Sequence, residues 1–391
     1  MSDTTRWLLP NGIDELLPEQ AHKVESVRRR LLDCCQRWGY EYVVPPLVEF
    51  TDSLLVGMGA DLDLLTCKFS DQESGRTLGV RADITPQAAR IDAHSLGREE
   101  VTRLCYSGST LRAVANTIPA DRSPVQLGAE IFGCSSIDAD IEMSRLLLSL
   151  LEQTTTPALT LDIGHVGFAK SVIDALDVTD AQRGVLVDLL QQKSGPGLKR
   201  FVKQLDDEVL ASQIATLADM HGGTAVIDIA AEAFGDVPGV TAMLDQIAVV
   251  VASSQSAYPD IDIYIDLTEY RGFKYHTGLV LSVYAEGVGV AIAKGGRYDN
   301  AGSAFGRARA ATGFAIDLKT LAGFDALDAS QSEAVVSSPI DACELLVVKE
   351  QELRLSGYTV VKALDGQHDR RADLILTKQG SEWQLVPIGS K

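Results

Sequence analysis

The stretch QLGAEIFG, residues 126–133, is the segment from which a fold can be predicted most directly. Its side chains alternate. Gln126, Gly128 and Glu130 share one face of a strand, and the apolar residues at positions 127, 129 and 131 share the other. An amide, a small residue and an acid on an otherwise apolar strand indicate a polar pocket. A sheet face exposed to solvent remains the alternative.

Other strand-like runs lie on both sides of a helical block. Residues 77–82 and 103–107 precede the block, residues 179–220 form it, and residues 278–284 and 288–294 follow it as a hairpin. This order predicts an α+β fold with one mostly antiparallel sheet, flanking helices and a helical insertion. An all-parallel sheet would need regular strand–helix alternation, which the pattern lacks.

The remaining elements complete two regions. A core over residues 1–325, with an insertion at about 176–222, precedes a short C-terminal α/β region over 326–391 with one helix and two or three strands. Further predicted elements are helices at 14–38, 87–94, 141–153 and 313–321, strands at 40–44, 159–163 and 261–265, and a linker at 325–338.

Composition excludes several classes of protein. The 391 residues include 35 Lys and Arg and 54 Asp and Glu. The resulting net charge of −19 disfavours binding to nucleic acid. The six cysteines show no zinc-site spacing and are expected to be free thiols, with no metal bound. We expect a cytoplasmic protein without a signal peptide or a membrane span.

Three further segments carry candidate binding residues. In residues 80–87, Asp83 and Thr85 are suited to receive an ammonium group, or else cap the helix that follows. Residues 269–278 crowd cationic and aromatic side chains together, as a pocket wall or as a solvated loop. In residues 295–299, GGRYD, two glycines permit close backbone approach, or simply form a tight turn.

Together these motifs resemble one family. The opening PNGID at 10–14, QLGAEIFG, YRGFKYHTG at 270–278 and GGRYD resemble histidyl-tRNA synthetase, a class II aminoacyl-tRNA synthetase, in collinear order over about residues 8–322. The resemblance implies an antiparallel sheet flanked by helices, with a helical insertion.

The resemblance also implies a histidine pocket. In it Asp83, Thr85 and Gln126 would take the α-ammonium group, and Arg112 or Arg271 the carboxylate. Glu130 would bind the imidazole, and the residues lining the pocket would be Tyr275, His276 and Tyr298.

Departures from the family pattern fall on the ATP-handling residues. Val114 stands where the second motif has Glu, and Thr320 stands where the third motif has Arg. In the YRGFKYHTG segment, Lys274 replaces an Asp and His276 replaces a Tyr. The tail is too short for a full anticodon-binding domain. The charge neutralisation on which adenylyl transfer depends is therefore expected to be lost.

A histidine pocket without adenylation residues resembles the histidyl-tRNA-synthetase-like regulatory subunits of ATP phosphoribosyltransferase. This implies no catalytic residues and no cofactor, with L-histidine as allosteric ligand. It also implies a homodimer through the core, assembled with short-form catalytic subunits into a hetero-octamer that histidine feedback-inhibits. Two alternatives stay open: a divergent histidyl-tRNA synthetase or amino-acid-activating ligase, and a scaffold without ligand.

Overall fold

The computed structural model describes residues 7–55, 60–115, 121–154, 156–269, 275–299, 301–325 and 334–388. The chain divides into two compact units, Met1–Ala326 and Leu327–Lys391. No helix in these described ranges is long and apolar enough to cross a membrane. All six cysteines are free thiols, and Cys34, Cys35 and Cys105 are buried.

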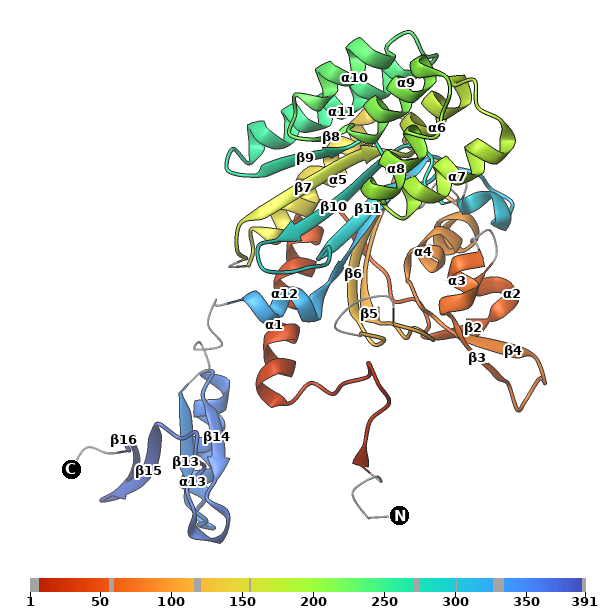
Figure 1. Ribbon diagram of the computed structural model, residues 1–391. Helices are drawn as coiled ribbons and strands as arrows, with labels where there is room; N and C mark the ends of the chain where they lie inside the picture. Colours follow the sequence, from red (N-terminus) through yellow and green to blue (C-terminus); the bar gives the residue numbers. More distant parts are fainter. Residues whose placement is uncertain are drawn as a thin grey trace. The chain divides into compact units, whose positions relative to one another are not determined.

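A sheet of nine strands forms the centre of the first unit (Figure 1). In sheet order the strands are β1 (Glu41–Tyr42), β5 (Thr102–Ser109), β6 (Val125–Phe132), β12 (Ala311–Asp317), β11 (Ala293–Arg297), β10 (Leu279–Ala285), β7 (Leu159–His165), β9 (Asp262–Asp266) and β8 (His221–Gly222). Only the β1–β5 and β7–β9 pairs are parallel among these strands. The predicted mostly antiparallel sheet is confirmed.

Both faces of β6 are covered. Its apolar residues Leu127, Ala129 and Ile131 belong to the main core, which includes the buried faces of α1 (Pro18–Arg37), α5 (Ile137–Leu151) and α11 (Val240–Ala257). The other face meets a smaller cluster that includes Ile84, Ala88 and Tyr106. The polar residues of β6 therefore lie in the interior of the unit.

The prediction of a helix at 313–321 was wrong for residues 313–317. Residues up to Asp317 form strand β12, and only α12 (Leu318–Phe324) is helical. The first four residues of β12 are buried on both faces, so the strand lacks the alternation by which strands are recognised. Asp317 caps α12 by accepting a hydrogen bond from the Lys319 backbone N–H at 3.0 Å.

The helical block extends further than predicted. Helices α7 (Asp180–Gln191), α8 (Gly195–Val202) and α9 (Glu208–Ala218) fall within the predicted insertion, but α10 (Val226–Phe234) and α11 continue the block to Ala257. At the start of α7, Thr179 and Gln182 form a capping box: the Gln182 backbone N–H donates to Thr179 Oγ1 at 3.3 Å.

A small sheet and one helix complete the surroundings of the site. The sheet has the order β2 (Val48–Phe50), β4 (Thr77–Val80) and β3 (Cys67–Ser70). The helix α4 (Thr85–Arg90) has Pro86 in its first turn and packs against β6. Other elements of the first unit are α2 (Thr51–Leu54), α3 (Ala60–Leu65) and α6 (Val166–Ala175).

The second unit is a four-stranded mixed sheet with one α-helix. Its strands, in sheet order, are β14 (Thr359–Lys362), β13 (Val335–Ser338), β15 (Leu374–Gln379) and β16 (Glu382–Pro387), and its helix is α13 (Glu344–Leu355). The predicted linker at 325–338 was too long because β13 is a buried strand. Its serines are satisfied internally: Ser338 bonds to Glu350, and Ser337 to His368 at 2.9 Å.

Candidate functional site

One cavity of about 1040 Å³ brings together eight of the nine residues predicted from the sequence. They are Asp83, Thr85, Arg112, Gln126, Glu130, Tyr275, His276 and Tyr298. The ninth, Arg271, lies outside the described residues. Gln126 is 6% exposed and Glu130 is 0% exposed, so the alternative of a solvated sheet face was wrong.

Glu130 lies at the buried end of the cavity between two tyrosines. The Tyr106 hydroxyl donates to its Oε1 at 2.9 Å, and the Tyr298 hydroxyl donates to its Oε2 at 2.5 Å. Burial raises the pKa of Glu130 to about 8, although the tyrosine hydrogen bonds act in the opposite direction. These surroundings therefore favour the protonated form of Glu130 more than water does.

Two glycines leave room for this arrangement. A Cβ on Gly313 of β12 would lie 1.5 Å from Glu130 Oε2, and a Cβ on Gly128 would lie 2.4 Å from the Tyr106 ring. Tyr106 is directly opposite Gly128 in the β5–β6 register. Sequence reasoning missed Tyr106 because only this strand register, a glycine opposite a large aromatic residue, identifies it.

Asp83, Thr85 and Gln126 are organised around the start of α4. The Thr85 backbone N–H donates to Asp83 Oδ1 at 2.9 Å, and the Ile84 backbone N–H donates to Gln126 Oε1 at 3.1 Å. Asp83 therefore accepts a hydrogen bond from the first residue of α4, whose N-cap residue is Ile84, and it also lines the cavity; its binding of an ammonium group stays a prediction. Thr85 Oγ1 lies 2.9 Å from the Tyr106 hydroxyl, which links this group to Glu130.

Aromatic side chains form another wall. The Tyr275 ring stacks on Tyr298, with centroids 5.2 Å apart and 13° between planes, and His276 meets Tyr275 edge-on at 5.0 Å. Tyr275 Oη and His276 Nδ1 are buried and have no hydrogen-bond partner among the described residues. Burial lowers the pKa of His276 to about 4, so its imidazole is neutral at physiological pH.

The GGRYD segment holds Tyr298 of this aromatic wall in place. Gly295 and Gly296 lie in β11 rather than in a tight turn, and a Cβ on Gly295 would lie 2.3 Å from the Gly313 carbonyl oxygen. Arg297 does not line the cavity: it pairs with Asp140 of α5 at 2.6 Å and donates to the Ser136 carbonyl at 3.1 Å. This buried ion pair positions the adjacent Tyr298.

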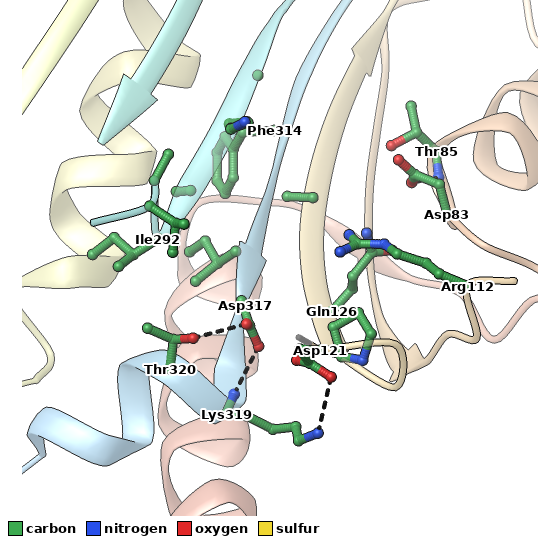
Figure 2. A pocket seen from close by; sticks show the side chains of 18 of the residues that line it. Asp83, Thr85, Arg112, Asp121, Gln126, Ile292, Phe314, Asp317, Lys319 and Thr320 are labelled. Atoms are coloured by element: carbon green, nitrogen blue, oxygen red, sulfur yellow. Dashed lines mark hydrogen bonds and ion pairs between the residues drawn. The ribbon is translucent and has the colours of Figure 1, made fainter. Parts of the chain in front are cut away.

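The opposite end of the cavity is rich in carboxylates. Lys319 Nζ donates to Asp14 Oδ1 at 2.6 Å and lies 3.5 Å from Asp121 Oδ1, while the Thr320 hydroxyl donates to Asp317 Oδ2 at 2.8 Å. Figure 2 shows Asp121, Asp317, Lys319 and Thr320 at one end, Asp83 and Thr85 at the other, and Arg112 beside Gln126 between them. Lys319 lowers the pKa of Asp14, and burial raises the pKa of Asp317.

This end is poorly suited to a polyphosphate. Three carboxyl groups surround it, and the ammonium group of Lys319 is shared between two of them. The local field therefore repels the anionic groups that an adenylating site must hold. Val114, at the other departure from the family pattern, is 55% exposed. Within the described ranges, no three His, Cys, Asp or Glu side chains gather as a metal site.

Comparison with known proteins agrees with this geometry. The family model for histidyl-tRNA synthetase matches residues 12–321. A protein from Saccharophagus degradans, named ATP phosphoribosyltransferase regulatory subunit, is 44% identical over 394 residues, covering 99% of this chain and 100% of its own. The chain belongs to this family of histidyl-tRNA-synthetase-like regulatory subunits.

Solved structures of similar proteins support the fold of the family. An ATP phosphoribosyltransferase regulatory subunit/histidyl-tRNA synthetase from Bacillus halodurans has a TM-score of 0.82 at 26% identity, covering 94% of this chain and 96% of that one. A chain from an ATP phosphoribosyl transferase complex of Thermotoga maritima has a TM-score of 0.59 at 17% identity, over 74% of this chain and 96% of that one. The latter likeness concerns the fold alone.

Proposed function

We propose that this chain is the regulatory subunit of a short-form ATP phosphoribosyltransferase, that it performs no chemistry itself, and that it senses L-histidine in the cavity described above. The observation that carries the proposal is the contrast between the two ends of that cavity. Glu130, enclosed by two tyrosines, suits an imidazole, whereas the Lys319 end does not suit ATP.

The polar groups of the cavity complement each part of a histidine zwitterion. Asp83, Thr85 and Gln126 take the ammonium group, and Arg112, with Arg271 as the other candidate, takes the carboxylate. Glu130 accepts a hydrogen bond from the ring. Tyr275, His276 and Tyr298 line the pocket around it.

The partners follow from the relatives' names and from the chemistry that is missing here. A subunit that holds no substrate of phosphoribosyl transfer acts on that reaction through the catalytic subunit, by favouring one state of the assembly. We place the chain in a homodimer formed through its core, within a cytoplasmic hetero-octamer that also contains catalytic subunits. Its net charge of −19 supports a role without nucleic acid.

The test is to mix the purified chain with a short catalytic subunit and to measure phosphoribosyl transfer while histidine is titrated. Activation without histidine and several-fold inhibition with it are expected. Removing one charge-assisted hydrogen bond costs about 1.5–3 kcal/mol, so Glu130→Ala should weaken histidine binding roughly 10–150-fold. The variant should still activate the catalytic subunit.

Three results would contradict the proposal. Histidine-dependent ATP–pyrophosphate exchange by the chain alone would identify it as an amino-acid-activating enzyme. If the chain activated the catalytic subunit but did not bind histidine, it would be a scaffold without a ligand. Inhibition that keeps its wild-type midpoint in Glu130→Ala would place the histidine sensor outside this cavity.

A further inference from the structure

Glu130 is enclosed by uncharged hydrogen-bonding groups and by another acid. Tyr106 of β5 and Tyr298, which follows β11, contact its two oxygens, and Gly313 of β12 lies against it. Asp83, before α4, adds a negative charge nearby. Among the residues that the structure describes, no cation forms an ion pair with Glu130. Thr85 and Tyr275 also lie near it, and the neutral His276 and the cationic Arg112 line the same cavity.

Such surroundings favour the protonated form of a carboxyl group. Removing an ionised carboxylate from water without a counter-charge is costly, and the group neutralises instead. Two phenol hydrogen bonds recover part of that cost but do not supply a charge. The pKa of about 8 agrees with this reasoning.

The hydrogen bonds around Tyr106 fit both protonation states. When Glu130 is ionised, Tyr106 donates to its Oε1. When Glu130 is protonated on Oε1, the tyrosine oxygen can accept a hydrogen bond from that O–H group and turn its own hydroxyl hydrogen toward Thr85 Oγ1, because either oxygen of that 2.9 Å contact can be the donor. Thr85 therefore offers Tyr106 a second acceptor, which lets the pocket hold the proton without an unpaired group.

We propose that the empty pocket stores a proton on Glu130 and that the imidazole of the incoming histidine takes this proton, so that the ligand is held as an imidazolium ion against an ionised carboxylate. The Glu130 O–H bond breaks and a ring N–H bond forms, and the proton stays within the pair. Both tyrosines then donate to the carboxylate. This inference rests on the proposed function, since it requires histidine to bind here.

Under this proposal there is one pH at which histidine binding neither takes up nor releases protons. An imidazole with a pKa of roughly 6.5 and Glu130 at about 8 together carry about one proton near pH 7.2, and the bound pair also carries one. Below that pH binding releases protons, and above it binding takes them up. If Glu130 were ionised in the empty pocket, binding at pH 7.2 would instead take up about 0.8 proton.

Calorimetry of L-histidine binding measures this count directly. The chain is titrated at about pH 6, 7.2 and 8, each in two buffers of different ionisation enthalpy. We expect release of about 0.75 proton at the lowest pH, no exchange in the middle and uptake of about 0.5 at the highest. Ring nitrogen-15 NMR at pH 8 should show bound histidine as the imidazolium ion.

Two variants make the test specific. Glu130→Gln keeps the shape of the side chain but has no group that titrates in this pH range, so proton uptake at pH 8 should vanish. Tyr106→Phe removes a donor that favours the ionised carboxylate. The proton uptake on histidine binding, which wild type shows above pH 7.2, should therefore begin at a higher pH in this variant.

The outcomes distinguish failure of the proton-transfer proposal from failure of the proposed function. Uptake of most of a proton at pH 7.2, or a neutral bound ring at pH 8, would overturn the inference while leaving the proposed function intact. Absence of histidine binding at every pH would overturn both.

Discussion

Gly313 and Glu130 occupy adjoining strands so closely that a Cβ on the glycine would lie 1.5 Å from the carboxylate oxygen Oε2. The two residues are also directly paired in the β6–β12 register. The acid can point into the cavity only because its cross-strand neighbour has no side chain. Gly313 is therefore part of the pocket although it contributes no polar side chain.

Gly313→Ala should displace Glu130 or open the β6–β12 pair. Overpacking of this kind costs about 1–3 kcal/mol of unfolding free energy, and histidine binding should fall with it. Urea unfolding and calorimetry measure the two effects. Gly184→Ala is the matched control, because its Cβ meets nothing within 4 Å; in the interior of α7 it should stabilise the chain by roughly 0.5–1 kcal/mol. Equal behaviour of the two variants would contradict the prediction.

Glu130→Gln should change how stability depends on pH. The pKa of Glu130 is raised from 4.5 to about 8 on folding, so the folded state binds the extra proton and the wild-type chain loses stability as pH rises through that window. The loss approaches about 1.4 kcal/mol per pH unit. Glutamine does not titrate. The unfolding free energy of the variant, relative to wild type, should therefore increase between pH 5 and 8 in urea titrations, whereas parallel curves would show that Glu130 is ionised.

Arg297→Ala should be strongly destabilising because it leaves the buried Asp140 carboxylate unpaired. Loss of one partner of a buried pair costs about 3–5 kcal/mol. Arg29→Ala provides the control: Arg29 pairs with Glu25 on the surface and is 73% exposed, so the cost should be about 0–1 kcal/mol. A similarly small cost at Arg297 would mean that water reaches Asp140.

Thr320→Arg should not create ATP–pyrophosphate exchange. Position 320 lies beside Asp317, to which the threonine hydroxyl already donates, so the new guanidinium is expected to pair with that carboxylate. Combining it with Asp14→Asn and Asp121→Asn removes two negative charges and should strengthen ATP binding relative to the single variant. Exchange activity in Thr320→Arg alone would refute this account of the acidic end.

Sequence patterns predicted this fold where one face of a strand was polar and the other apolar. QLGAEIFG at 126–133 has that alternation and was placed correctly. β12 is buried on both faces along its first half, and its sequence was therefore mistaken for a helix. Val335–Ser338 was taken as linker because its serines suggest exposure, whereas Glu350 and His368 satisfy them in the interior.

The candidate site was predictable as a set of residue types but not as a geometry. Eight motif residues do line one cavity, yet Tyr106 belongs to no motif and enters through its strand register with Gly128. The use of Arg297 as a structural partner of Asp140 was equally hidden, since the two residues are 157 positions apart. Long-range pairing of this kind leaves no local signal.

The contacts of Lys319 give the cation at this end of the cavity a structural role. Lys319 fastens the segment before α1 to α12 through Asp14, and to the Ser123 carbonyl at 2.9 Å. The positive charge at this end of the cavity thus links segments that are far apart in the sequence. A substitution that freed this cation to bind a phosphate group would also remove the link between these segments.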